Sequence, residues 1–255
     1  MNFVAYLINL DGSAERLQNA TEELANARIN FIRVPAFDGR GKDPKQIVGY
    51  NDVATRRFMG RSLKGGEIGC YKSHLDCAQR FLDTNQSYGL VFEDDIRVDQ
   101  DFYDIVSKAI EWLESAQIDW ELIHLGADKL KIYTHLHSLE GVQTRDLVQA
   151  HYFPMTTSAL LWSRAGALNF VSNYAEICMP VDNLMREIMV RSNKGLTIWP
   201  PLVAQRGMES DIDGGQKRKL GGRTWDYGIL KQKRLLMNKF IAFLHKLKIA
   251  KPNRK

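Results

Sequence analysis

The sequence contains no apolar run that approaches the roughly 18 residues needed to span a bilayer, so we expect no transmembrane helix. Its first residues, MNFVAYLINLD, include neither the basic region nor the small-residue cleavage site of a secretory signal peptide. Cysteine is scarce: Cys70, Cys77 and Cys178 are the only three, each in apolar surroundings. This small, odd number indicates reduced, buried thiols rather than a disulfide framework. We therefore expect a cytoplasmic protein.

Proline is limited to 7 of the 255 residues, and no low-complexity segment or internal repeat is present. With 44% hydrophobic and 25% charged residues, the chain has the composition of a soluble globular protein. This composition excludes disordered and collagen-like classes. No linker divides the chain, so we expect one α/β domain over residues 1–215 and a C-terminal tail over residues 216–255.

Positive charge is concentrated in that tail, although the net charge of the whole chain is only +5. Residues 216–255 contain 13 of the 35 Lys and Arg residues but only one of the 30 acidic residues, Asp226. The domain before the tail is therefore acidic overall. A nucleic-acid-binding domain carries its basic stripe on the folded core, so we expect no nucleic-acid partner.

The tail has the pattern of a basic amphipathic helix, because apolar residues recur at helical spacing with basic residues among them. The apolar positions are Leu236, Phe240, Phe243, Leu244 and Leu247, and the basic ones are Lys233, Arg234, Lys239, Lys246 and Lys248. Such a helix can rest on an anionic membrane, where each basic residue contributes about 1 kcal/mol. That interpretation predicts peripheral association with the inner face of the inner membrane. The main alternative is a helix packed on the domain with a solvated charged face, and a weaker third option is nucleic-acid binding through the tail.

The N-terminal residues have the pattern of a βαβ unit with a parallel sheet. We expect a buried strand over residues 3–10, a helix over 14–27 and a second strand over 30–36. Residues 40–66 read as an irregular basic loop, and residues 126–150 as a loop or hairpin. Further helices are expected over residues 67–84, 103–115, 164–174 and 181–192, and further strands over 89–95, 120–125, 157–162 and 198–203.

The expected strand at residues 89–95 ends in three consecutive acids, Glu93, Asp94 and Asp95. Clustered carboxylates repel one another unless a positive charge lies beside them, and ligands of open α/β sheets bind at the carboxyl ends of the strands. Glu93 and Asp95 are two residues apart and can point to the same side. Their oxygen atoms suit a hard divalent cation, whereas the alternative is a solvated acidic turn.

Polar residues also follow the neighbouring strands. Asn9 and Asp11 end the first strand, and Arg16 lies where it can meet an anion above the sheet, although Asn and Asp also cap helices. Asp38 and Gly39 end the second strand at the same edge of the sheet. This convergence of three strand ends predicts a ligand site there.

The segment KGGEIGCYKSH (64–74) leads from two glycines into a helix. Gly65 and Gly66 can let backbone N–H groups approach a phosphate, and His74 can hydrogen-bond a substrate. The alternative is helix capping and a buried histidine. Further along, Asp182 begins an expected helix, where it can be either a catalytic carboxylate or an N-cap.

Four motifs appear in order: YLINLDGSAERL (6–17), FIRVPAFDG (31–39), GEIGCYKSH (66–74) and GLVFEDDI (89–96). They resemble the bacterial lipooligosaccharide glycosyltransferases of glycosyltransferase family 25, which include β-galactosyltransferases and are related to collagen hydroxylysine galactosyltransferases. PVDN (180–183) and PLVAQRGMESDI (201–212) resemble later blocks of the family. The resemblance covers residues 3–212. In residues 156–167 a leucine stands where we expect a tyrosine, so acceptor contacts are not carried over.

The resemblance implies a GT-A-type, Rossmann-like, mostly parallel sheet flanked by helices, a UDP-galactose or UDP-glucose donor, and inversion at the anomeric carbon. It also implies that the Glu93–Asp95 segment replaces the DxD metal motif, with Glu93 and Asp95 binding Mn²⁺ or Mg²⁺. The positions expected to contact the donor are Asn9, Asp11, Arg16, Asp38, Gly39, Glu67, Gly69, Lys72, Ser73, His74 and Asp94.

The first hypothesis is therefore an inverting hexosyltransferase that extends lipooligosaccharide or LPS. Asp182 is the expected general base, with Glu209 and Asp211 as rivals. The second is a nucleotidyltransferase, but LDGSAER lacks the Gly-rich, basic loop that such an enzyme needs after its first strand. The third is a non-catalytic, membrane-associated module that binds nucleotide sugars, against which the carboxylate cluster argues.

Overall fold

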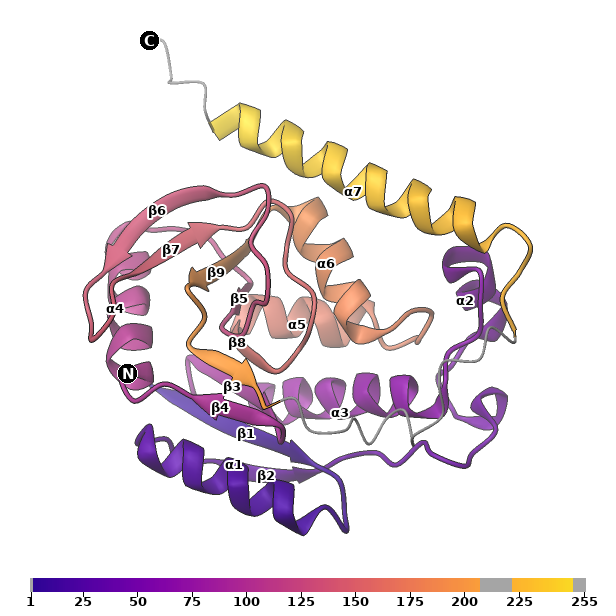
Figure 1. Ribbon diagram of the computed structural model, residues 1–255, viewed down its shortest axis with the longest axis horizontal. Coiled ribbons are helices and arrows are strands. Elements are labelled where there is room, and N and C mark those ends of the chain that lie inside the picture. The colour runs from indigo at the N-terminus through magenta and orange to yellow at the C-terminus, as the bar shows by residue number, and fades with distance from the viewer. Residues whose placement is uncertain (1, 207–221, 250–255) are drawn as a thin grey trace.

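The computed structural model describes residues 2–206 and 222–249 and has an eight-stranded sheet at its centre, in the order β2-β1-β3-β8-β5-β9-β7-β6 (Figure 1). Strands β7 and β8 run opposite to the other six. The expected α/β fold with a mostly parallel sheet is confirmed. The strands are β1 (Phe3–Asn9), β2 (Ile32–Pro35), β3 (Tyr88–Glu93), β5 (Leu122–His124), β6 (Thr134–Leu139), β7 (Arg145–Gln149), β8 (Ala159–Ser163) and β9 (Gly195–Trp199).

Helices cover both faces of the sheet. One core packs α1 (Ala14–Asn26) and α4 (Phe102–Ser115) against it, and the other packs α3 (Gly65–Leu82), α5 (Arg164–Asn173) and α6 (Val181–Ser192). The strands supply both cores because successive side chains point to opposite faces. In β1, for example, Leu7 enters the first core, whereas Tyr6 and Ile8 enter the second.

The first three strands place the expected site residues at one edge of the sheet. β1 pairs in parallel with both β2 and β3. Asn9 lies beside Pro35 of β2, and Ile8 lies beside Glu93 of β3. The carboxyl ends of the three strands therefore meet, as expected from the βαβ pattern.

Two expectations about local structure were wrong. The basic segment 40–66 contains the 3-10 turn Pro44–Gln46 and a helix, α2 (Asp52–Met59). The Asn51 side chain caps α2 by accepting the Ala54 N–H, and Gly60 ends it in the left-handed conformation at φ +71°.

The expected strand over residues 198–203 is split in two. Pro200 and Pro201 have no N–H to donate to a ladder, so β9 ends before them. After them, β10 (Val203–Gln205) pairs with β4 (Ile96–Val98) in a separate two-stranded sheet.

The C-terminal helix α7 (Tyr227–Ile249) lies along the outside of the domain (Figure 1). Asn238 donates a hydrogen bond to Glu187 of α6 at 2.9 Å, and Arg234 donates one to the Phe58 carbonyl of α2 at 3.0 Å. The expected basic helix is therefore present and is docked on the domain. Within residues 2–206 and 222–249, no helix combines the length and the apolar character needed to cross a membrane.

Candidate functional site

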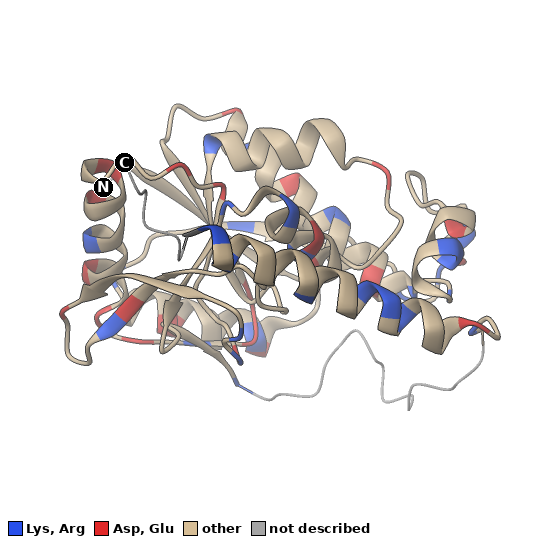
Figure 2. Cartoon of the chain, turned by 90° about the horizontal axis from the view of Figure 1, so that it is seen from above, with Lys and Arg blue, Asp and Glu red and all other residues tan. Residues whose placement is uncertain are grey.

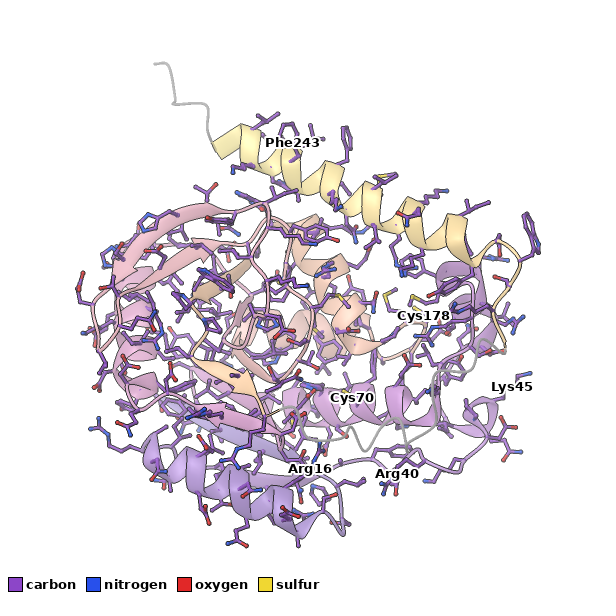
Figure 3. All side chains as sticks on the ribbon, viewed as in Figure 1. Arg16, Arg40, Lys45, Cys70, Cys178 and Phe243 are labelled. Atoms are coloured by element: carbon purple, nitrogen blue, oxygen red, sulfur yellow. The ribbon has the colours of Figure 1, made fainter. Side chains whose placement is uncertain are left out.

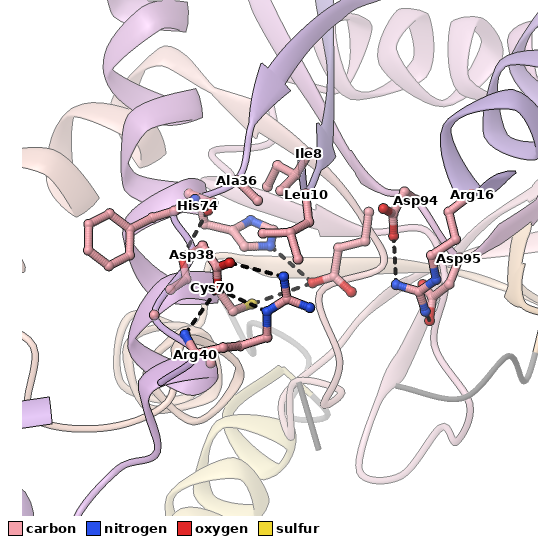
Figure 4. Close-up of a pocket in the computed structure, with 16 residues that line it drawn as sticks. Ile8, Leu10, Arg16, Ala36, Asp38, Arg40, Cys70, His74, Asp94 and Asp95 are labelled. Atoms are coloured by element: carbon pink, nitrogen blue, oxygen red, sulfur yellow. Dashed lines mark hydrogen bonds and ion pairs between the residues drawn. The ribbon is translucent and has the colours of Figure 1, made fainter. Parts of the chain in front are cut away.

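A pocket opens at the carboxyl ends of β1, β2 and β3, against the first turns of α3 (Figure 4). Its walls include ten of the residues singled out in the sequence: Arg16, Asp38, Gly39, Gly66, Gly69, Ser73, His74, Glu93, Asp94 and Asp95. The structure therefore brings together residues from four separate sequence motifs.

Asp94 accepts hydrogen bonds from Asn9 at the end of β1 and from Arg16 on the helix that follows it. The Asn9 amide donates to its Oδ2 atom at 2.7 Å, and Arg16 on α1 donates to Oδ1 at 3.0 Å. Arg33, at the adjacent strand β2, donates to the Asn9 side-chain oxygen at 3.0 Å, which fixes the direction of the amide. Asp94 is buried, so these charge-assisted bonds tie the first helix to the end of β3.

Asp95 lies beside this network but is less well neutralised. Its Oδ1 atom is buried and has no hydrogen-bond partner among the described residues, and Arg16 is 3.8 Å from its Oδ2 atom. Burial, together with repulsion from Glu93 and Asp94 that Arg16 only partly offsets, raises the pKa of Asp95 to about 6. An added cation would relieve this repulsion.

Glu93 is surrounded by donors from two elements. Thr157, just before β8, donates to its Oε1 atom at 2.7 Å, and His74 Nε2 on α3 lies 3.2 Å from the same atom. The Cys70 thiol approaches it at 3.7 Å. Burial opposes ionisation, but the hydrogen bonds from His74, Thr157 and Cys70 outweigh it and lower the pKa of Glu93. The carboxylate is therefore held ionised in the pocket wall.

The loop after β2 lies against the start of α3 through glycines. A Cβ atom on Gly69 would come within 2.3 Å of the Phe37 carbonyl oxygen, so this approach requires glycine. Ser73 accepts the Phe37 N–H at 2.9 Å and donates to the Gly69 carbonyl at 2.8 Å. Gly69 and Ser73 therefore shape the pocket wall.

Asp38 projects from the same loop and forms a local pair with Arg40. Arg40 donates its Nε and Nη2 groups to the two carboxylate oxygens at 2.9 Å each, and its backbone N–H donates at 3.0 Å (Figure 4). These side-chain and backbone hydrogen bonds lower the pKa of Asp38 to about 2. The pocket thus presents a positive group, Arg40, that the sequence reasoning did not single out.

Four expected donor contacts make other interactions instead of lining this pocket: Asn9, which bonds to Asp94 behind the wall, and Asp11, Glu67 and Lys72. Asp11 pairs with Arg33 at 2.5 Å, and Glu67 pairs with Arg61 at 2.6 Å. Glu67 also accepts the Lys64 N–H at 2.9 Å and so caps α3. Lys72 donates to the Val48 carbonyl at 2.9 Å.

Asp182 begins α6 and lies outside the pocket wall but close to it. Its charge helps to raise the pKa of the Cys70 thiol, after burial and Glu93. Burial also raises the pKa of Asp182 itself, with Glu67 adding to the effect. Asn183 donates its backbone N–H and its amide to Oδ1 at 2.7 and 2.9 Å, while Oδ2 accepts no hydrogen bond from a described residue. The rivals Glu209 and Asp211 lie outside the described residues.

Two sets of side chains in or beside the pocket could bind a cation. Among the described residues, Cys70, His74 and Glu93 form a group with ligand atoms within 4.8 Å of one another, which would suit a soft metal. The unpartnered Oδ1 of Asp95 and the repulsion between Asp95 and Glu93 suit a hard cation with oxygen ligands. The binding of Mn²⁺ or Mg²⁺ by Glu93 and Asp95 therefore stays a prediction, which the unpartnered Asp95 oxygen supports.

Sequence reasoning missed Thr157, Cys70 and Arg33 as parts of this site. Thr157 precedes β8, which is antiparallel to β3 and pairs with it although 64 residues separate Thr157 from Glu93. No local pattern marks such a contact. Cys70 had a signal, because it lies four residues before His74 and therefore on the same helix face.

A model of glycosyltransferase family 25, described as LPS biosynthesis proteins, matches residues 3–185. Human procollagen galactosyltransferase 2 is 29% identical over 189 residues, which are 71% of this chain and 29% of that protein. The human inactive glycosyltransferase 25 family member 3 is 29% identical over 190 residues, 71% of this chain and 30% of that protein. Procollagen galactosyltransferase 1-A of Xenopus laevis is 29% identical over 185 residues, 71% of this chain and 30% of that protein.

The chain thus spans about three tenths of the length of the curated relatives it matches. Among solved structures, a glycosyltransferase involved in glycosylation of the major capsid of PBCV-1 has a TM-score of 0.40 and 8% identity, covering 92% of this chain and 100% of that chain. The family model covers well over half of the sequence, including all the strands and helices that build the pocket. The chain therefore belongs to glycosyltransferase family 25.

Proposed function

We propose that this chain is an inverting hexosyltransferase that moves galactose or glucose from a UDP-sugar to a hydroxyl group of a lipooligosaccharide or LPS glycan. Family membership alone does not imply turnover, because an inactive human member has the same 29% identity to this chain as a human galactosyltransferase. The observation that carries the proposal is the joint presence of Arg16, Glu93 and Asp95 at the carboxyl ends of the parallel strands. A diphosphate requires positive charge, and open α/β sheets bind ligands at this edge.

Glu93 and Asp95 would hold a Mn²⁺ or Mg²⁺ ion. When bound, the ion supplies positive charge that neutralises the diphosphate leaving group. Glu93 is suited to this role because His74 and Thr157 fix its Oε1 atom. Arg16 already bridges the region between Asp94 and Asp95, so it lies where it can bind a phosphate oxygen.

The loop after β2 would bind the nucleoside. Asp38 is exposed enough to accept hydrogen bonds from it, and Arg40 keeps this carboxylate ionised. Gly66 and Gly69 line the adjacent wall, where the lack of side chains lets the donor lie close to α3. Ser73 and His74 maintain that wall through their bonds to the loop and to Glu93.

Asp182 is the proposed general base. The acceptor oxygen forms a bond to the anomeric carbon while the bond from that carbon to the diphosphate oxygen breaks, and its electron pair leaves with UDP. The proton of the acceptor hydroxyl passes to the Asp182 carboxylate. The raised pKa of Asp182 makes it a stronger base than an ordinary aspartate, and Asn183 orients it through Oδ1.

Asp182→Asn tests this assignment, with Asp104→Asn as the matched control because Asp104 is an exposed aspartate on α4. General-base catalysis contributes about 10²–10⁴-fold, so we expect kcat to fall by about 10³-fold while the donor Kd stays within about threefold. Collapse of donor affinity would contradict the base assignment. Donor binding by the natural protein without turnover would identify a non-catalytic module, and release of pyrophosphate would identify a nucleotidyltransferase.

A further inference from the structure

Helix α7 turns its most apolar stripe away from the domain. Five large residues recur along one side of the helix at intervals of seven, four, three and four positions: Ile229, Leu236, Phe240, Phe243 and Leu247. Between 45% and 65% of each is exposed. Figure 3 shows Phe243 projecting from α7 on the side away from the sheet. A helix on a globular domain normally turns its apolar stripe inward, so this orientation requires another explanation.

The opposite side of α7 is the one that packs on the domain. Ala242 and Asn238 are buried there, and Asn238 bonds to Glu187 of α6. At its N-terminal end, Thr224 donates to the Gly60 carbonyl at 2.8 Å, and Arg234 bonds to Phe58. These contacts with α2 and α6 fix the rotation of the helix about its axis. The apolar stripe therefore faces outward because contacts with α2 and α6 hold the helix in a fixed orientation.

Basic residues flank the exposed stripe. Residues 222–249 contain seven Lys and Arg residues and a single acid, Asp226. Figure 2, which views the molecule from above, shows the positive residues spread along α7. Lys233 and Lys239 lie on either side of Leu236 in the sequence and are exposed. The surface thus combines protruding apolar side chains with a strong excess of positive charge.

We propose that the α7 outer face, defined as Ile229, Leu236, Phe240, Phe243 and Leu247 with Lys233 and Lys239, docks on an anionic lipid surface. Charge complementarity selects this occupant, because lipid phosphates neutralise the lysines while the acyl boundary accepts the apolar side chains. A second copy of the chain is disfavoured, since two faces of the same positive charge would repel each other. This inference is independent of the proposed catalytic activity.

The full-length protein can be tested by co-sedimentation with vesicles of phosphatidylcholine alone and of phosphatidylcholine mixed with phosphatidylglycerol. We expect binding to the anionic vesicles only. Phe240→Ser with Phe243→Ser should weaken it at least about tenfold, because the apolar contribution is lost. Val48→Ser with Val142→Ser is the matched control, because both valines are exposed away from α7, at 83% and 92%.

The charge contribution is tested by Lys233→Gln with Lys239→Gln, which should weaken binding about 30-fold at low salt, since each basic residue contributes about 1 kcal/mol. Lys45→Gln with Lys129→Gln is the control, because both lysines are exposed and lie off α7. Circular dichroism confirms that each variant is folded. Equal binding to neutral vesicles, or equal losses in control and test variants, would overturn the proposal. Self-association that Phe240→Ser with Phe243→Ser abolishes, without vesicle binding, would assign the face to a second copy instead.

Discussion

Gly39 and Gly65 lie against each other so closely that neither can carry a side chain. A Cβ atom on Gly65 would lie 1.8 Å from the Gly39 carbonyl oxygen, and one on Gly39 would lie 2.0 Å from the Gly65 carbonyl oxygen. This contact joins the loop after β2 to the first turn of α3. It therefore sets the position of Asp38 relative to the helix that carries His74.

Gly65→Ala should lower the free energy of unfolding by about 1–3 kcal/mol, because the new methyl group forces two backbones apart. Gly228→Ala is the control, since a Cβ atom there meets nothing within 4 Å. Urea unfolding of both variants measures the effect. A Gly65→Ala protein as stable as the Gly228→Ala protein would show that the contact is looser than described.

Asp94→Ala should destabilise the protein by about 2–4 kcal/mol, because it removes the acceptor of the buried Asn9 amide and of Arg16. The exposed pair of Arg28 and Asp104, 3.6 Å apart, provides the comparison. Asp104→Ala should cost at most about 1 kcal/mol. Chemical denaturation measures both, and equal losses would contradict the structural role given to Asp94.

Mn²⁺ should raise the Tm of the natural protein, since a ligand at 100 times its Kd stabilises the folded state by about 2.7 kcal/mol. Asp95→Asn should abolish this shift without destabilising the metal-free protein, because the neutral amide removes repulsion from Glu93 and Asp94. Thermal unfolding with and without the ion measures both effects. The control is Asp76→Asn, at a half-exposed aspartate on α3 that pairs with Arg80.

Cys70→Ser separates the two candidate ligand sets. Ligation by Glu93 and Asp95 predicts an unchanged Mn²⁺ shift in this variant. Loss of the shift in Cys70→Ser, with its retention in Asp95→Asn, would instead place the ion at Cys70, His74 and Glu93.

Stability should fall in mild acid through His124. Its Nε2–H faces the carbonyls of Met155 and Thr156 at 3.0 Å, its Nδ1 accepts the Gly126 N–H, and burial lowers its pKa to about 4 from 6.5. A histidine whose folded pKa is depressed contributes its full stability above pH 6.5 and loses it as the pH falls towards 4.

Protonation of His124 should therefore lower the free energy of unfolding by about 2 kcal/mol at pH 5 relative to pH 7.5. The fall in the free energy of unfolding between pH 7.5 and pH 5 should be smaller in His124→Gln. His135→Gln, at an exposed histidine, should show the same fall as the natural protein. Urea unfolding across this pH range measures the fall. The same fall in all three proteins would show that His124 is not the group that titrates.

Much of the fold follows from local pattern. The βαβ unit, α3 and α6 were predicted within a few residues, because apolar periodicity and capping groups are local signals. Helix α2, DVATRRFM, was missed because it is only eight residues long, and the hydrogen bond from Arg234 of α7 to its Phe58 carbonyl supports it. The β4–β10 pair joins residues that lie more than 100 positions apart, which no local signal reveals.

The candidate site was predictable to the extent that parallel strands share an edge. Glu93, Asp94 and Arg16 were expected there and line one pocket. Thr157 could not be predicted as a partner of Glu93, because it reaches that carboxylate through tertiary packing. Asn9 was expected at this edge, but its hydrogen bond to Asp94 was not predicted. Side-chain pairing also explains why Glu67 and Lys72 lie outside the pocket wall, since Arg61 and the Val48 carbonyl bind them.

The most direct test of the central claim is an assay of UDP release by the natural protein from a panel of UDP-hexoses, with and without Mn²⁺ and with lipooligosaccharide acceptor. The proposed function predicts metal-dependent release from UDP-galactose or UDP-glucose that the acceptor stimulates. If a chelator left the release of UDP unchanged, the chain would still be a transferase, but Asp95 would not bind a catalytic ion. No release from any donor, with acceptor and metal present, would contradict the claim that this site transfers sugar.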